Sequence, residues 1–248
     1  MKRLLALAAI AAVVGVGLVG FEAGEEQSPA TGAASVAAAG SKAADSKAAV
    51  QSAQGSRAPA SSDPITAIRS TRACLDSGTC DFPQTDSRSY EFAVKRRLAV
   101  ELAEAHAALG PDAVEEIARE LMEIDDGYVQ TQAILVFSAL PPSRENLAAM
   151  TSTLALSHDP LVIEQAMNEW ERYIGSPEEA MVQEFLADFI AHGGQFTAEK
   201  ASSLVLRFLN ERSESAFRAA LAGMNPESTA AVNLRRAIAE YERQVTGG

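Results

Sequence analysis

Residues 126–140 read DGYVQTQAILVFSAL, and residues 159–174 read DPLVIEQAMNEWERYI. Both stretches have an aspartate, a valine three residues later and an alanine four residues after that, and the second is displaced from the first by about 33 positions, a period typical of helical-repeat proteins. In each stretch the aspartate is suited to cap a helix, the valine to pack inward and the alanine to admit a neighbouring helix. The pattern predicts two equivalent helices in successive repeats.

Helical periodicity extends over residues 63–248. Apolar residues recur there at intervals of three and four, and no strand-like alternation of useful length appears. Gly110–Pro111 and Pro141–Pro142 end periodic segments, and Ser143 and Asn225 are suited to cap the helices that follow. The sequence predicts about ten helices joined by short loops, which makes neighbours antiparallel. The predicted fold class is therefore all-α.

The repeated aspartate, valine and alanine resemble the second helix of bacterial HEAT-like repeats, over about residues 112–192. The resemblance implies a right-handed α-solenoid, a curved stack of antiparallel helical hairpins whose concave face commonly binds other proteins. An irregular helical bundle is the alternative fold.

The N-terminal part has the composition of an export segment and a linker. In residues 1–21, two basic residues precede an uncharged apolar run from Leu4 to Phe21, as in an export signal. The run is at the short end for crossing a bilayer, and small residues are missing at the usual cleavage positions. We expect either a signal anchor or a signal peptide, followed at residues 22–62 by a disordered tether rich in alanine, serine and glycine.

These alternatives predict different locations. An uncleaved anchor would place residues 4–21 in the inner membrane as a single pass, with the folded domain in the periplasm. Cleavage would give a soluble periplasmic or secreted protein.

Export also bears on Cys74 and Cys80, the two cysteines of the chain. An oxidising compartment favours a disulfide between close cysteines. A thioredoxin-like redox site has two intervening residues rather than five, and a zinc site needs about four ligands. We predict a structural disulfide that pins a helix end to the loop leaving it.

The histidines do not predict a metal site. His158 and Asp159, with His106 upstream and Asp188 downstream, resemble the order of ligands in HD-domain phosphohydrolases, which are also all-helical. In that family the pair lies within a helix, whereas here Pro160 directly follows and makes Asp159 a helix cap. His192 precedes a glycine pair at a helix end, an ordinary place for a cationic residue. We predict no metal and no cofactor.

The segment ESAF, residues 214–217, resembles the segment that carries the catalytic glutamate of lytic transglycosylases. The resemblance implies that Glu214 would be a general acid acting on the cell wall. The glycine-leucine-methionine-glutamine motif of that family does not follow, and Ser213 and Glu214 are also suited to begin a helix. We therefore predict no catalytic residue and interpret the protein as a non-enzyme.

Charge bears on partners. The chain has 21 Lys and Arg against 33 Asp and Glu, a net charge of −12, which disfavours nucleic acid. The basic run Lys95–Arg97 is interpreted as a solvated face and Trp170 as a core anchor. We expect a scaffold, adaptor or assembly factor that binds another envelope protein. The alternatives are a periplasmic chaperone or foldase for exported clients, and a cell-wall-acting enzyme using Glu214.

Overall fold

The computed structural model describes residues 63–80 and 89–247, which contain ten α-helices, two 3-10 helices and no strand. The all-α prediction, with about ten helices, is confirmed. In chain order the elements are α1 (Pro64–Ser77), α2 (Tyr90–Leu109), α3 (Pro111–Met122), α4 (Gly127–Ser138), α5 (Arg144–Leu154), α6 (Pro160–Trp170), η1 (Glu171–Tyr173), α7 (Glu179–His192), α8 (Gln195–Leu204), η2 (Val205–Phe208), α9 (Glu214–Gly223) and α10 (Thr229–Thr246).

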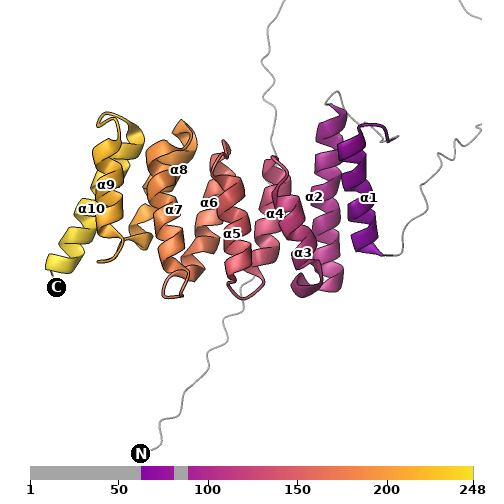
Figure 1. The fold of residues 1–248 in the computed structure, drawn as a ribbon, viewed down its shortest axis with the longest axis horizontal. Helices are drawn as coiled ribbons and strands as arrows, with labels where there is room; N and C mark the ends of the chain where they lie inside the picture. Colours follow the sequence, from indigo (N-terminus) through magenta and orange to yellow (C-terminus); the bar gives the residue numbers. More distant parts are fainter. Residues whose placement is uncertain (1–62, 81–88, 248) are drawn as a thin grey trace, which may run out of the picture. The chain divides into compact units, whose positions relative to one another are not determined.

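The helices stand side by side in two layers (Figure 1). In the first layer α2, α4, α6, α8 and α10 each contact the next, and in the second layer α3, α5, α7 and α9 do the same. Among the described residues, five hairpins pack in this way, formed by α1 with α2, α3 with α4, α5 with α6, α7 with α8, and α9 with α10. The predicted stack of antiparallel hairpins is therefore what these residues form.

The repeated residues take the places that their spacing predicts. Asp126 accepts hydrogen bonds from the backbone N–H groups of Tyr128 and Val129, at 3.0 and 3.2 Å, and so caps α4. Asp159 caps α6 by accepting from the N–H of Leu161 at 2.9 Å. The paired valines and alanines are fully buried between the layers, as is Trp170, which meets the ring of Phe185 edge-on at 5.1 Å.

The start of α10 differs from the prediction. Asn225 does not cap it, because its side-chain oxygen accepts from the N–H of Glu227 at 3.1 Å and forms a local turn instead. The helix begins at Thr229, and Ser228 is its cap, accepting from the N–H of Ala231 at 3.2 Å. An asparagine before a proline can either cap a helix or form such a turn. Here it forms the turn, and the helix begins only at Thr229.

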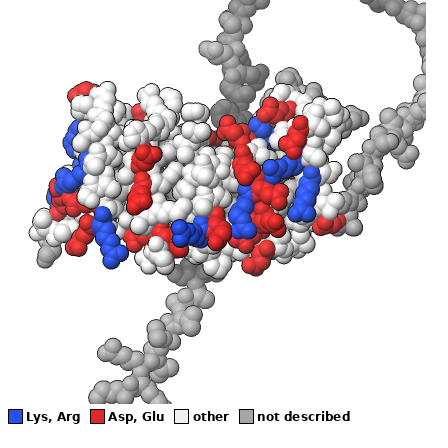
Figure 2. All heavy atoms as spheres, in the orientation of Figure 1, with Lys and Arg blue, Asp and Glu red and all other residues white. Residues whose placement is uncertain are grey.

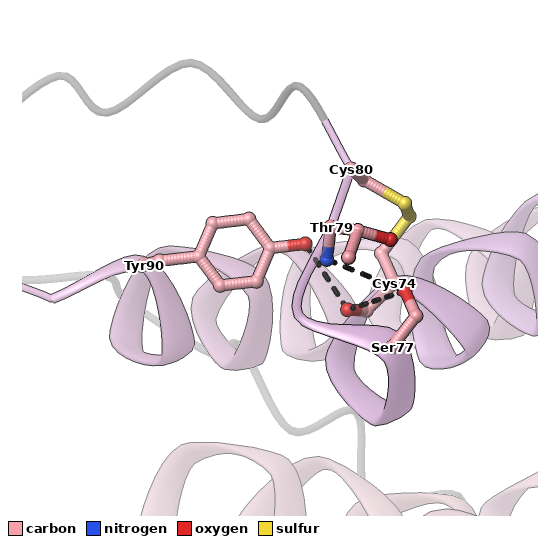
Figure 3. Close-up of a disulfide and its surroundings, with 5 residues drawn as sticks. All are labelled: Cys74, Ser77, Thr79, Cys80 and Tyr90. Carbon is pink, nitrogen blue, oxygen red and sulfur yellow. Dashed lines mark hydrogen bonds between the residues drawn. A yellow bond between two sulfur atoms is a disulfide. The ribbon is translucent and has the colours of Figure 1, made fainter.

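Cys74 and Cys80 form a disulfide, as predicted (Figure 3). Cys74 lies in the last turn of α1, and Gly78 ends the helix in a left-handed conformation with φ of 65°. Tyr90, the first residue of α2, donates its hydroxyl to the carbonyl oxygen of Cys74 at 3.0 Å. The disulfide and this hydrogen bond together hold the end of α1 to the segment that leaves it and to the next helix.

The predicted inner-membrane, single-pass location is corrected. Within the described residues, no helix is both long and apolar enough to cross a membrane. The longest, α2, has 20 residues, but charged side chains such as Glu91, Lys95 and Arg97 recur along it. Residues 4–21, to which the crossing was assigned, and the predicted tether at residues 22–62 lie outside the described residues.

Arg172 holds α4 and α6 together. Its guanidinium donates to the carbonyl oxygens of Phe137 and Ser138, at 3.3 and 2.9 Å, at the end of α4. It also binds the carboxylate of Glu169 at 2.8 Å. Glu169 is almost fully buried, and this burial raises its pKa despite the hydrogen bonds from Arg172 and Ser138. Arg172 therefore provides hydrogen bonds to the last carbonyl groups of α4 and a cation for the buried carboxylate of Glu169.

Replacing Arg172 with methionine is expected to lower the free energy of unfolding by about 3 kcal/mol at neutral pH, because a buried carboxylate loses its cation. A carboxyl whose pKa is raised by folding contributes stability at low pH and loses it as pH rises. The loss should therefore shrink as pH falls from about 7 to about 5. Urea unfolding measures both effects, with Arg144→Met as the exposed control. A loss that is independent of pH, or no larger than the control's, would contradict this role.

Replacing both cysteines with serine is expected to lower the free energy of unfolding by about 2 kcal/mol, because the disulfide restricts a short loop in the unfolded chain. The measurement is urea unfolding of the oxidised protein and of the Cys74→Ser, Cys80→Ser variant. Reductant should weaken the original protein to the level of the variant and leave the variant unchanged. Equal stability of the two oxidised proteins would contradict a structural role.

Candidate protein-binding surface

The N-terminal ends of α4, α6 and α8 lie together at one edge of the first layer. A Cβ atom on Gly127, the first residue of α4, would overlap the carboxylate of Asp159, which caps α6. A Cβ atom on Gly194, before α8, would lie 3.0 Å from Nδ1 of His158 in the loop before α6. Glycine at these two places lets each helix start approach the next closely.

Large apolar side chains project from this edge. Tyr128, Leu161 and Phe196 are the second residues of α4, α6 and α8, and Leu156 lies in the loop between α5 and α6. We call these four residues the apolar edge. Their exposed fractions are 52% for Tyr128, 70% for Leu161, 67% for Phe196 and 83% for Leu156. Single exposed apolar residues are ordinary, but equivalent positions on three adjacent helices form an aligned set.

Helix geometry explains why these side chains face solvent. The residue that follows each of Tyr128, Leu161 and Phe196 is buried between the layers. Consecutive residues of an α-helix point about 100° apart, since there are 3.6 residues in a turn. The apolar residue at the start of each helix therefore lies beside the buried stripe rather than in it.

Polar contacts between helices fix the spacing of the edge. Lys200 of α8 binds Glu164 of α6 through Nζ and Oε2 at 2.9 Å. Further along, Arg207 donates to Asn168 at 3.1 Å and binds Glu171 at 2.6 Å. These contacts hold α6 and α8 in register, and with them Leu161 and Phe196.

A cation lies over the first side chain of the edge. The guanidinium of Arg96 in α2 is 4.1 Å from the centroid of the Tyr128 ring. Its neighbours point elsewhere, since Lys95 pairs with Glu91 and Arg97 with Glu101. The basic run at Lys95–Arg97 therefore forms no single patch, in agreement with its interpretation from the sequence.

A cavity of about 600 Å³ lies beside α8, between the loop that joins α7 to α8 and the loop that joins α9 to α10. Its volume is in the range of ligand pockets. Gln195 and Glu199 of α8 line it, one on each side of Phe196 in the sequence. The lining is otherwise made of small, apolar and uncharged polar residues, apart from Glu227. The apolar edge thus borders a cavity at its α8 end.

Figure 2 shows how charge is distributed on one face of the molecule. Charged side chains gather over α1 to α3 and at the α10 end, and they are sparser between these ends. The centre of a protein interface is typically depleted of charged residues. On this face, the middle hairpins therefore carry fewer charged side chains than the two ends of the stack.

Glu214 has a structural partner in α9. It is the first residue of the helix, and Oε1 accepts from Nε of Arg218 at 2.8 Å. Arg218 also binds Glu242 of α10. Glu214 does not line the cavity beside α8.

The three histidines lie at the ends of three different helices. Asp159 is the cap of α6, as predicted, and His192 contacts Asp188 of its own helix at 3.0 Å. His106 is in the last turn of α2, and His158 is in the loop before α6. Among residues 63–80 and 89–247 no group of three or more His, Cys, Asp or Glu is placed to hold a metal ion.

Comparison with family models, with curated proteins and with solved structures gives no significant match. Sequence reasoning missed Tyr128, Leu161 and Phe196, although the repeat contained a signal. In both copies, a large apolar residue stands between the capped helix start and the inward valine, where the helical pattern needs none.

Gly127→Ala is expected to lower the free energy of unfolding by about 1 kcal/mol, because the new methyl group displaces the Asp159 carboxylate from its capping position. Gly223→Ala is the control, since a Cβ atom there has nothing within 4 Å. Thermal or urea unfolding of both variants gives the comparison. If Gly127→Ala is as stable as Gly223→Ala, the close stacking of helix starts is not a constraint on this edge.

Proposed function

We propose that this chain is a HEAT-like helical-repeat protein that acts as a scaffold, adaptor or assembly factor by binding another protein. The two layers of stacked hairpins support the repeat assignment, as does the shared capping and packing of α4 and α6. Stacked repeats commonly present extended binding surfaces. The net charge of −12 favours a protein partner over nucleic acid.

The apolar edge is the observation that carries this proposal. Exposed apolar groups that are contiguous or aligned mark protein interaction surfaces, and aromatic residues are enriched at the centres of such surfaces. The buried residues that follow them, Val162 and Thr197, fix Leu161 and Phe196 to the core before any partner arrives, and an ion pair joins their helices. A preorganised surface loses less entropy on binding than a mobile one.

Photo-crosslinking in cells of the source organism tests the proposal. A photoreactive phenylalanine analogue replaces Leu161 or Phe196 in the full chain, and Ser152 on the exposed side of α5 is the control position. We expect one adduct of defined mass from both edge positions and none from position 152. Many adducts of different masses would favour a chaperone for varied clients. Equal adducts at all three positions would contradict a role of the apolar edge.

A further inference from the structure

The apolar edge and the cavity beside α8 meet at the same helix turn. Phe196 projects into solvent from this turn, and its sequence neighbour Gln195 lines the cavity. Glu199, one turn further along α8, also lines it. A partner segment that packs on Leu161 and Phe196 would therefore have the mouth of the cavity within reach of its next side chains.

The cavity has a negative lining. Glu199 and Glu227 are the charged residues that line it, and no lysine or arginine does so. Neither carboxylate forms an ion pair with another residue in the described part of the chain. Arg235 donates to the carbonyl oxygen of Pro226 in the nearby loop, but it is not among the lining residues.

Most other charged side chains along the edge already have a partner within the protein. The carboxylates of Asp126 and Asp159 accept from backbone N–H groups, and the guanidinium of Arg96 covers Tyr128. Lys200 is bound to Glu164. Glu199 and Glu227, the acids that line the cavity, are therefore the carboxylates at the α8 end that form no ion pair within the described residues.

The spacing of the edge suits a helical segment. Neighbouring packed helices lie about 8–10 Å apart, so the apolar side chains on α4, α6 and α8 recur at about that interval. Residues seven apart on an α-helix are about 10.5 Å apart along its axis. An amphipathic helix laid across the three helix starts can thus place one apolar side chain on each.

We propose that the apolar edge binds a cationic amphipathic helix of a partner protein, and that the cavity beside α8 receives one of its lysine or arginine side chains. Leu161 and Phe196 contact the apolar face of that helix, and Glu199 with Glu227 binds the cation. This inference rests on the protein-binding function proposed above and specifies the chemistry of the partner.

The test uses the full oxidised chain and three fluorescein-labelled helical peptides of about 20 residues that share one leucine face. The polar face of the first peptide consists of lysines, that of the second of glutamines and that of the third of glutamates. Fluorescence anisotropy at low salt, about 50 mM, measures the affinities. We expect the lysine peptide to bind about tenfold more tightly than the glutamine peptide, and the glutamate peptide to bind most weakly. The Leu161→Ser variant should weaken binding of the lysine peptide.

Charge variants of the cavity give the decisive comparison. Glu199→Gln with Glu227→Gln is expected to weaken the lysine peptide about five- to tenfold, because its cation loses both carboxylates. Glu116→Gln with Glu145→Gln makes the same change in net charge at exposed acids of α3 and α5, and it should have less than about a twofold effect. Equal effects of the two double variants would overturn the assignment of the cavity.

Other outcomes separate this inference from the proposed function. If the glutamine and lysine peptides bind equally and Leu161→Ser weakens both, the edge binds proteins but the cationic partner is wrong. If no peptide binds, the inference is overturned. The proposed function is then still tested separately by photo-crosslinking from positions 161 and 196. Sedimentation velocity over a range of protein concentrations tests whether the chain dimerises through the edge. A dimer abolished by Leu161→Ser would make that copy the occupant and overturn the inference.

Discussion

The packing of each hairpin on the next is the constraint on which the rest of this structure depends. A single pair of amphipathic helices cannot cover both of its apolar faces, so the core is completed only by a neighbour on each side. The buried cluster accordingly runs through the stack, from Ile68 in α1 to Ile238 in α10. Small buried residues such as Ala133 and Ala166 allow the close approach that this packing needs.

The surface follows from the same packing. Once equivalent helices are held in register, any residue repeated at one helix position is repeated in space at a regular interval. Gly127 against Asp159 and Gly194 against His158 bring successive helix starts together, and Lys200 with Glu164 adds an ion pair between α8 and α6. The three helix-start residues of the apolar edge, Tyr128, Leu161 and Phe196, are thus aligned as a consequence of the stacking.

The sequence was sufficient for the features that depend on local chemistry. The caps at Asp126 and Asp159 and the disulfide of Cys74 with Cys80 each depend on residues a few positions apart. The start of α10 was wrong because Asn225 and Ser228 offer competing local hydrogen bonds. The exposure of Tyr128 and Leu161 was not predicted, because a large apolar residue in a helix is expected in the core. Each directly precedes an inward valine and so lies about 100° away from it around the helix, which was the overlooked signal.

Stability does not account for the apolar character of the edge. The side chains of Leu161 and Phe196 are mostly exposed, so they bury little surface and contribute little to the free energy of folding. A polar residue would serve the fold as well at either place and would improve solubility. Two helix starts with large apolar groups, held rigidly and beside a negatively lined cavity, are therefore better explained by contact with a partner than by the requirements of the fold.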